Sequence, residues 1–253
     1  MRQDDRAPFD RALHRARMLA YPDGAYVGQE SFMTASEIRE LARQAGVGPA
    51  VRVLDLCCGT AGPGRFVTRE LGCDYLGVDA SAGAVAIARE RAGDLPCRFA
   101  VAHVPPVPHG PFDVVLLLET MLAFEHKDAL AGEIFRALRP GGRFAFTVEA
   151  GQPLTAAERA AMPDADTVWL TPLDELVACL KRAGLRVTWQ EDHSQAHRAT
   201  ARALASAFAA DAEDIAAQIG RQALEELVVA HRLWIGWLDA GRVRKVAVVA
   251  ERE

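Results

Sequence analysis

The stretch Val53-Leu-Asp-Leu-Cys-Cys-Gly-Thr-Ala-Gly-Pro-Gly64 decides the fold of this chain. Its apolar residues form a short run of the kind found in a strand that is covered on both faces. Gly59, Gly62 and Gly64 follow directly, and helical spacing resumes at Arg65. A strand, a glycine turn and a helix in this order bring backbone N–H groups and a helix N-terminus against a ligand. The stretch therefore predicts a nucleotide-type binding site.

Two details separate this site from a dinucleotide site. The glycines follow the order G-x-x-G-x-G instead of G-x-G-x-x-G, and Pro63 removes one N–H donor from the turn. Asp55, at the end of the strand, would repel a pyrophosphate but attract an ammonium group. Asp79, which closes the next apolar run, can accept hydrogen bonds from both hydroxyls of a ribose. S-adenosylmethionine (SAM) has both a ribose and a cationic end, so it fits this pattern.

Four successive stretches resemble the motifs of class I SAM-dependent methyltransferases, in the branch that acts on small molecules. They are 53–64, Leu76-Gly-Val-Asp79-Ala-Ser, Phe112-Asp-Val-Val-Leu-Leu-Leu-Glu119 and Leu138-Arg-Pro-Gly-Gly-Arg143. The resemblance runs from about Gln29 to Glu149, and more loosely to the C-terminus. It implies SAM as the cofactor, S-adenosylhomocysteine as the product, and an α/β fold with a Rossmann-like, doubly wound, seven-stranded sheet.

Alternating apolar runs and helical spacings predict the elements of such a sheet. We expect strands at about 51–57, 74–79, 97–102, 112–119, 143–149, 185–191 and 243–250, the last of which the resemblance makes antiparallel and inserts into the sheet. Helices are expected within 1–22, from a cap at Thr34 or Ser36 to Gln44, at 84–91, 129–138 and 173–183, and as a pair within 196–240 that meets near Asp211.

The organisation of the chain is interpreted as a single domain over residues 1–253. Residues 1–34 would form an N-terminal arm or lid, 35–195 the SAM-binding core and 241–253 the final strand. Two segments, 150–171 and 196–240, are longer than the bare fold needs and are expected to form a helical cap over the acceptor. The alternative is that these helices only complete the hydrophobic layer.

Composition narrows the class of protein. At 253 residues, half of them hydrophobic, the chain can bury one sizeable core, and a net charge of −5 argues against a nucleic-acid surface. No apolar run approaches the length of a membrane span, and we expect no signal peptide, because Met1-Arg-Gln-Asp-Asp lacks the apolar region of one. The five cysteines are scattered and lack zinc-site spacing, so we expect no metal and a reducing cytoplasm. The expected partner is a small-molecule acceptor, and the expected assembly is a monomer or homodimer.

The chemistry of methyl transfer requires mainly orientation, because the sulfonium methyl is already activated, and a base only where the acceptor must lose a proton. Glu119 ends the fourth expected strand, where it could accept a proton or anchor an acceptor amine. The candidate catalytic residues are Glu119, His193 and His197. Further possibilities are Glu149, His126 and His231, although a histidine at such a position is commonly only solvated.

The cofactor site is expected to include Tyr26, Gln29, Asp55, Cys57, Gly59, Gly62, Asp79, Ala80, His103, Val104 and Glu119. The resemblance implies that the arm folds over the cofactor, with Gln29 on the methionine carboxylate and Tyr26 or Phe32 near the sulfonium. His103 stands where the family usually has an Asp for the adenine amino group, so backbone groups at Ala102 or Val104 are the alternative. Three tryptophans of the cap would suit a flat or cationic acceptor, or would simply pack: Trp169, Trp234 and Trp237.

We expect the protein to transfer the SAM methyl group to an oxygen or nitrogen atom, with carbon less favoured, of a specialised metabolite. A macromolecule methyltransferase is disfavoured, because Glu119-Thr-Met-Leu stands where N-methylases of adenine or amides have Asn/Asp-Pro-Pro-aromatic. A dinucleotide oxidoreductase is disfavoured by Pro63 and Asp55. A SAM-binding fold that catalyses a non-methylating reaction, such as a cyclisation, remains open, since its cofactor site would look the same.

Overall fold

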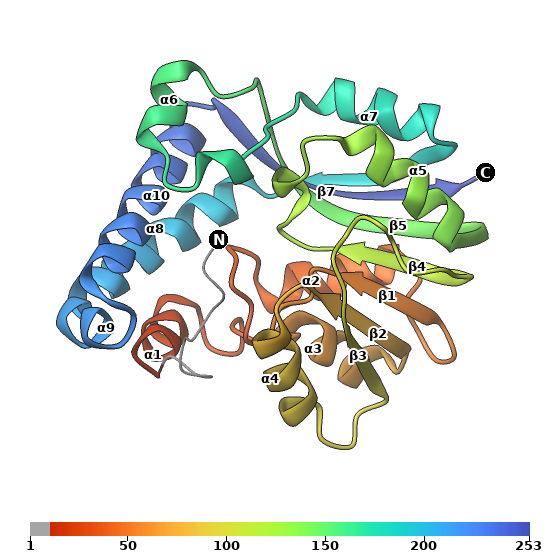
Figure 1. Ribbon diagram of the computed structural model, residues 1–253, viewed down its shortest axis with the longest axis horizontal. Helices are drawn as coiled ribbons and strands as arrows, with labels where there is room; N and C mark the ends of the chain where they lie inside the picture. Colours follow the sequence, from red (N-terminus) through yellow and green to blue (C-terminus); the bar gives the residue numbers. More distant parts are fainter. Residues whose placement is uncertain (1–10) are drawn as a thin grey trace.

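The computed structural model describes residues 11–253, which build one seven-stranded sheet with helices on both faces (Figure 1). The strand order is β3-β2-β1-β4-β5-β7-β6. The strands are β1 (Arg52–Leu56), β2 (Asp74–Asp79), β3 (Cys97–Val101), β4 (Phe112–Leu117), β5 (Leu138–Gly151), β6 (Leu185–Asp192) and β7 (Val243–Arg252). β1 to β5 pair in parallel, and β7 lies between β5 and β6 antiparallel to both. The predicted doubly wound sheet, with its inserted last strand, is confirmed.

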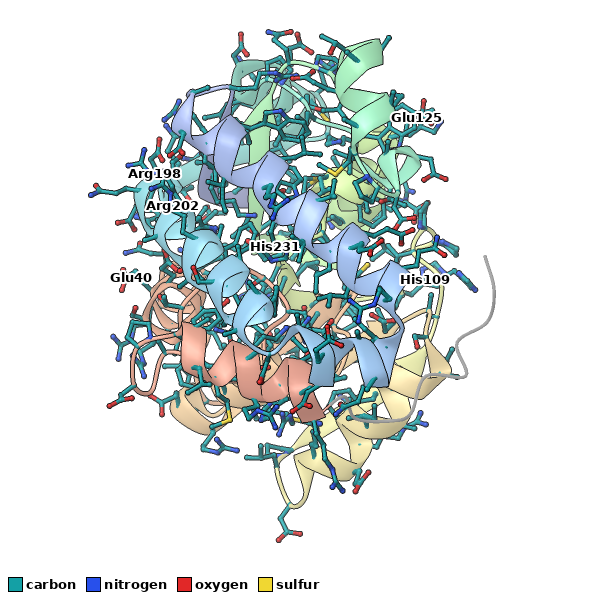
Figure 2. The ribbon with its side chains drawn as sticks, turned by 90° about the vertical axis from the view of Figure 1, so that its left-hand side faces the viewer. Glu40, His109, Glu125, Arg198, Arg202 and His231 are labelled. Atoms are coloured by element: carbon teal, nitrogen blue, oxygen red, sulfur yellow. The ribbon has the colours of Figure 1, made fainter. Side chains whose placement is uncertain are left out.

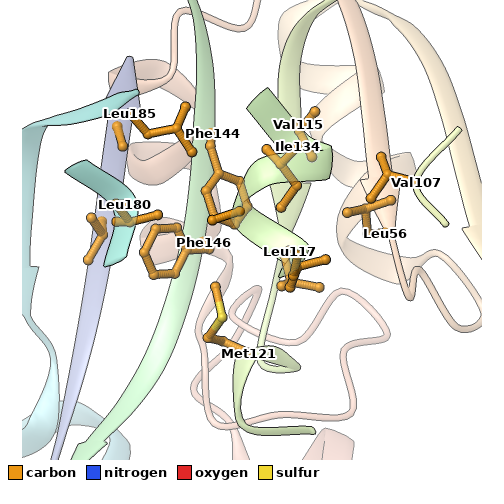
Figure 3. Close-up of a cluster of buried hydrophobic side chains, with 14 of the residues drawn as sticks. Leu56, Val107, Val115, Leu117, Met121, Ile134, Phe144, Phe146, Leu180 and Leu185 are labelled. Atoms are coloured by element: carbon orange, nitrogen blue, oxygen red, sulfur yellow. The ribbon is translucent and has the colours of Figure 1, made fainter. Parts of the chain in front are cut away.

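Two helical layers cover the sheet because alternate side chains of each strand point to opposite faces. On one face pack α2 (Ala35–Gln44), α3 (Gly62–Leu71) and α4 (Ala82–Ala92), and on the other α5 (Lys127–Ala137) and α7 (Leu173–Arg182). Along β1, Val53 belongs to the first layer and Leu54 to the second. Figure 3 shows the second layer, where the rings of Phe144 and Phe146 stack with centroids 4.5 Å apart. The strands are held rigidly enough to present their ends as a fixed edge.

A separate group of helices lies beside the carboxyl edge of the sheet. It consists of α1 (Arg11–Ala20), α8 (Ser194–Ala210), α9 (Ala212–Ile219) and α10 (Arg221–Asp239). α1 packs Leu13 and Ala16 into the same apolar cluster as Leu204 and Phe208 of α8, so the N-terminal arm and the cap form one unit. Figure 2 views this unit face on, with α8 and α10 side by side.

The remaining cap segment, 150–171, folds as α6 (Ala156–Ala161) and the short 3-10 helix η2 (Ala165–Thr167). It packs Leu154 and Met162 against Trp237 of α10 and Val243 of β7. A further 3-10 helix, η1 (Met121–Ala123), follows β4. Both cap segments therefore contact the core through apolar side chains at the same edge of the sheet.

Several predicted boundaries differ from the structure. Segment 196–240 holds three helices instead of two: the break at Asp211 is confirmed, but Gly220, with φ +89°, ends α9 and starts another helix. β4 ends at Leu117 and not at Glu119, and β5 begins early, at Leu138, directly where α5 ends. Thr34, not Ser36, caps α2, in a capping box with Glu37. The part of the predicted N-terminal helix within 1–10 lies outside the described residues. Within 11–253, no helix is long and apolar enough to cross a membrane.

Candidate cofactor and acceptor site

The glycine loop between β1 and α3 is fixed by hydrogen bonds to Asp79. The N–H of Gly59 donates to Asp79 Oδ2 at 2.8 Å, and the N–H of Ser81 donates to Oδ1 of the same carboxylate at 2.8 Å. Asp79 therefore joins the loops that follow β1 and β2. Cys57 and Ala61 have φ values of +57° and +56°, a left-handed conformation that is costly for residues with a Cβ. Such strain is typical of loops that are shaped around a ligand.

Asp55 lies directly beneath this loop and is only 3% exposed. Its carboxylate accepts a hydrogen bond from the Tyr75 hydroxyl at 2.5 Å. Burial, with a contribution from Asp79, raises the pKa of Asp55 to about 7 even though the Tyr75 hydrogen bond opposes the shift. The third glycine of the motif belongs to this pair, since a Cβ on Gly64 would lie 2.1 Å from the Tyr75 oxygen. Only glycine leaves room for the hydroxyl that orients Asp55.

The N-terminal arm crosses the same loop. A Cβ on Gly62 would lie 2.4 Å from the carbonyl oxygen of Gly28, so the second glycine lets the arm approach. Gln29 is 2% exposed: its Oε1 accepts from the N–H of Val27, and its Nε2 donates to the carbonyls of Ala25 and Met33. This uses the amide of Gln29 to hold the arm in shape and leaves no N–H free for a methionine carboxylate.

Tyr26, the other predicted arm residue, also has protein partners. Its ring lies 5.4 Å from the rings of Tyr21 and His14, in the cluster that joins the arm to the cap. Phe32 lies next to the residue that follows β4, because its N–H donates to Glu119 Oε2 at 3.4 Å. The arm is therefore tied to the end of β4 through Phe32, whereas Tyr26 and Gln29 stabilise the arm itself.

Glu119 stands at the centre of a buried charged network. It follows β4 with a left-handed φ of +58°. Its Oε1 lies 2.6 Å from Lys245 Nζ and accepts from the Thr147 hydroxyl at 2.8 Å, while its N–H donates to Thr147 Oγ1 at 2.7 Å. Lys245 also donates to Glu149, and its side chain is only 3% exposed. One lysine from β7 thus joins carboxylates from the ends of β4 and β5.

The electrostatics of this network favour the ionised forms at its centre. Burial alone would raise the pKa of Glu119, but Lys245, and after it His197, outweigh burial and lower that pKa. Burial would lower the pKa of Lys245, but the two glutamates outweigh it and raise the pKa. Glu149 has a raised pKa, because burial and the charge of Glu119 outweigh Lys245. Glu119 and Lys245 therefore form the charged pair, and Glu149 is the weaker acid.

The predicted histidines lie in different surroundings. His193 and His197 are brought together at the start of α8, but beside Glu37 of α2. His126 is exposed before α5, and His231 is half-buried, with Nδ1 2.7 Å from the Leu227 carbonyl oxygen. His103, after β3, and Ala80, after β2, are exposed at the carboxyl edge, with Val104 half-buried beside them.

The cap tryptophans mainly pack. The rings of Trp234 and Trp237 lie 5.1 Å apart, edge to face, in the apolar cluster that holds segment 150–171. Trp169 is half-buried and lies under the guanidinium of Arg159. Trp234 and Trp237 therefore pack against each other and the cap, as the alternative interpretation of these residues predicted.

Sequence reasoning missed three members of the site: Lys245, Thr147 and Glu37. The signal for Lys245 was present, because it lies two residues after Val243 in an apolar strand and so shares the inward face of Val243, opposite to Arg244. A lysine at a buried strand position needs a carboxylate partner.

The fold and the glycine loop define an α/β protein with a nucleotide-type cofactor site at the carboxyl ends of β1 and β2. The methyltransferase domain family model matches residues 53–142. Phosphoethanolamine N-methyltransferase 1 of Arabidopsis thaliana is 31% identical over 109 residues, which cover 42% of this chain and 22% of that protein. Methyltransferase GfsG of Streptomyces halstedii is 28% identical over 180 residues, 67% of this chain and 65% of that protein.

Among solved structures, that of the [4+2]-cyclase SpnF has the same fold, with a TM-score of 0.72 and 23% identity, covering 91% of this chain and 85% of that one. The methyltransferase domain match and these relatives support a class I SAM-dependent methyltransferase, the family that the four motifs resemble. SAM is the cofactor of that family. The chain spans less than a third of the length of several curated relatives that it matches.

Proposed function

We propose that this protein transfers the methyl group of SAM to an oxygen or nitrogen atom of a small-molecule acceptor. The observation that carries the proposal is the Glu119–Lys245–Glu149 network, which lies next to the cofactor loop at the carboxyl edge of the sheet. A polar heteroatom can be held by such a charged site, whereas an apolar carbon acceptor gains nothing from it. This favours oxygen and nitrogen over carbon.

The cofactor would lie along the carboxyl ends of β1 and β2. The two oxygens of Asp79 each accept one backbone N–H, and their remaining lone pairs can accept the ribose hydroxyls. Asp55 would face the ammonium group, and the backbone of Cys57, Gly59 and Gly62 would approach the sulfonium side. The adenine would lie toward Ala80, His103 and Val104, where the exposed edge leaves either a side chain or a backbone group to bind it.

Glu119 would act mainly by orienting the acceptor. Lys245 keeps its carboxylate ionised, which suits it to bind an acceptor amine or hydroxyl but makes it a weak base. Most of the rate would then come from holding the acceptor atom in line with the methyl group, at ~3–3.5 Å. Phe32, which is hydrogen-bonded to Glu119, would close the crevice from the arm side.

The cap would supply the walls of the acceptor pocket. Segments 150–171 and 196–240 meet the sheet at its carboxyl edge, where Glu119 follows β4 and Glu149 lies near the end of β5. Trp237 and Leu154 also pack in one apolar cluster, as expected if the cap completes the apolar layer. We propose that both apply, with the apolar faces fixing the cap and its polar faces selecting the acceptor.

The experiment combines cofactor binding with an acceptor panel. Calorimetry should show SAM and S-adenosylhomocysteine binding in the micromolar range and no NAD(H) binding. Phosphoethanolamine leads the panel because the Arabidopsis relative bears its name, followed by small amines and hydroxylated compounds. Mass spectrometry should find a product heavier by one methylene group, together with S-adenosylhomocysteine. NAD binding without SAM binding would overturn the proposal.

The alternative reaction has its own outcome in this assay. A non-methylating reaction such as cyclisation would leave SAM unconsumed while an acceptor is converted to an isomer of the same mass. A macromolecule methyltransferase would label a protein or nucleic acid from radiolabelled SAM and none of the panel. Either result would replace the small-molecule methyl transfer proposed here.

We also propose that the protein works in a reducing compartment such as the cytoplasm. All five cysteines are free thiols, and Cys57 and Cys58 are half-buried in the cofactor loop. Burial raises the pKa of Cys57 to about 12, which keeps this thiol unreactive beside a methyl donor. Treatment of the folded protein with diamide should therefore leave SAM affinity unchanged.

A further inference from the structure

A second cluster of titratable side chains joins the cap to the core. His193 immediately precedes α8 and His197 follows four residues later, so the two rings lie on the same face of the helix. Both face Glu37 in the first turn of α2: Glu37 Oε1 lies 3.4 Å from His193 Nδ1 and 3.6 Å from His197 Nε2. One ligand atom from each of the three residues lies within 4.8 Å of the other two.

Most ring nitrogens of the two histidines in this cluster are buried without a hydrogen-bond partner in the described part of the chain. His197 is 0% and His193 7% exposed. Neither ring nitrogen of His197, nor Nδ1 of His193, has a hydrogen-bond partner within residues 11–253. Buried polar groups are almost always satisfied, because each unpaired one costs about 1–3 kcal/mol. Two of these unpaired nitrogens, His193 Nδ1 and His197 Nε2, face the same carboxylate oxygen, which points to a bound species.

The distances fit a metal ion better than a hydrogen bond. A hydrogen bond between nitrogen and oxygen is about 2.7–3.2 Å long. Two ligands bound at ~2.0–2.1 Å in a tetrahedral site lie ~3.3 Å apart. The observed separations of 3.4 and 3.6 Å match this second value. Two imidazoles and one carboxylate form a donor set typical of zinc and related divalent ions, with one position left open.

The neighbours of the cluster fix its ligand atoms. Oε2 of Glu37 accepts from the N–H and the hydroxyl of Thr34 at 2.6 and 3.0 Å, which leaves Oε1 to face the histidines. Oε2 of Glu191 lies 3.3 Å from His193 Nε2, on the side of the ring away from Glu37. A carboxylate behind a histidine in this way fixes the tautomer that presents the other nitrogen to a metal.

We propose that Glu37, His193 and His197 bind one divalent ion of the zinc type, which ties α8 of the cap to α2 of the core. The expectation of no metal rested on the absence of cysteine pairs and overlooked the H-x-x-x-H spacing on a helix. The cluster adjoins the Glu119 network, because His197 packs against Phe32, but it shares no ligand atom with that network. Metal uptake can therefore be tested without an acceptor.

The test uses untagged protein that has been treated with a chelator and dialysed. Zinc should bind at one equivalent, measured by elemental analysis, and should raise the melting temperature. Cobalt(II) should give visible d–d bands of a nitrogen and oxygen site, without the thiolate charge-transfer band that Cys57 or Cys58 would produce. Wild-type protein that takes up neither ion would overturn the proposal.

Variants locate the ion. Glu37→Gln and His197→Ala should weaken zinc binding by about 100-fold or more. His231→Ala is the matched control, because His231, labelled in Figure 2, is a half-buried cap histidine on α10 whose ring packs against Phe32 and Phe208. Zinc affinity should be unchanged in it. Retention of full zinc affinity in folded Glu37→Gln would place the ion elsewhere. If His197→Ala does not fold, the cobalt spectrum of the wild-type protein still tests the proposal.

Discussion

The cofactor end of the proposed site, at the glycine loop and Asp79, is built differently from its acceptor end, at Glu119. At the cofactor end, the groups that would meet a ligand come from one short stretch of chain and from Asp79, and most of them are backbone atoms. At the acceptor end, the charges come from Glu119 after β4, Glu149 of β5 and Lys245 of β7, which are distant in sequence. The first end depends on backbone conformation and the second on a balance of buried charges. Mutations should therefore affect the two ends differently.

The largest effect should come from removing the lysine of the charged network. Lys245→Met leaves two buried carboxylates without their cation, which should cost about 3–5 kcal/mol of unfolding free energy. Chemical denaturation measures this loss. The control is Lys181→Met, at an exposed position of α7, which should change stability by less than ~0.5 kcal/mol.

A second substitution sharpens this result. Adding Glu149→Gln to Lys245→Met removes one of the unpaired charges and should recover part of the lost stability. A Lys245→Met protein that loses less than ~1 kcal/mol would show that water reaches the network and that the acceptor end is not dry.

The next largest effect should be at the cofactor end. Asp79→Ala removes the acceptor that we assign to the ribose and also frees the loop N–H of Gly59. SAM affinity should fall by about 30- to 150-fold, which corresponds to about 2–3 kcal/mol. Asp74→Ala is the matched control: Asp74 begins the same strand, is paired with exposed Arg98, and lies at the opposite edge of the sheet. Equal losses in the two variants would mean that the ribose lies elsewhere.

The two ends also differ in how far the sequence predicted them. The strand, the glycine turn and Asp79 follow local rules of periodicity and turn chemistry, so the loop and the position of the carboxylate were predicted correctly. The network at Glu119 depends on β7 being inserted beside β5, which pairs Glu149 with Lys245 in register. The inserted strand was expected from the family, but a side-chain pairing across 96 residues leaves no local pattern.

The arm shows a different limit of sequence reasoning. Gln29 was assigned to the cofactor by analogy with relatives, but its amide is used within the arm itself. Nothing in the sequence distinguishes a glutamine that binds a ligand from one that satisfies backbone groups of a turn. The same holds for His193 and His197, whose ligand geometry appears only when α2 and α8 meet.

A smaller effect should follow from neutralising Glu119. Glu119→Gln keeps the size of the side chain and an oxygen that can accept from Lys245 and Thr147. Turnover should fall by about tenfold with unchanged SAM affinity, since a carboxylate with a lowered pKa orients the acceptor more than it removes a proton. The control is Glu125→Gln, at an exposed position labelled in Figure 2. A loss of about 10²-fold or more would instead assign Glu119 as a general base, and a loss of SAM affinity would move it to the cofactor end.

The smallest effect concerns Asp55 and depends on pH. The pKa of Asp55 in the free protein is raised to about 7, and only its ionised form attracts the ammonium of SAM. Between pH 6 and 7 its ionised fraction rises from about one tenth to one half, while an α-amino group with a pKa of ~7.7–8.0 stays mostly charged. SAM affinity should therefore increase by about fivefold over this range, and Asp55→Asn should abolish the increase. Calorimetry at the two pH values measures it.

The stability of the free protein should change with pH in the opposite direction to its SAM affinity. Because the folded pKa lies above the ordinary value of 3.8, the free folded protein holds an extra proton between about pH 4 and 7. Its stability should fall as pH rises through that window, and bound SAM should offset the fall by pairing with the carboxylate. The control ligand is 5′-methylthioadenosine, which keeps the ribose and adenine but lacks the amino group, so its affinity should not change between pH 6 and 7. An equal pH dependence for both ligands would assign the titration to a group near the adenosine and not to Asp55.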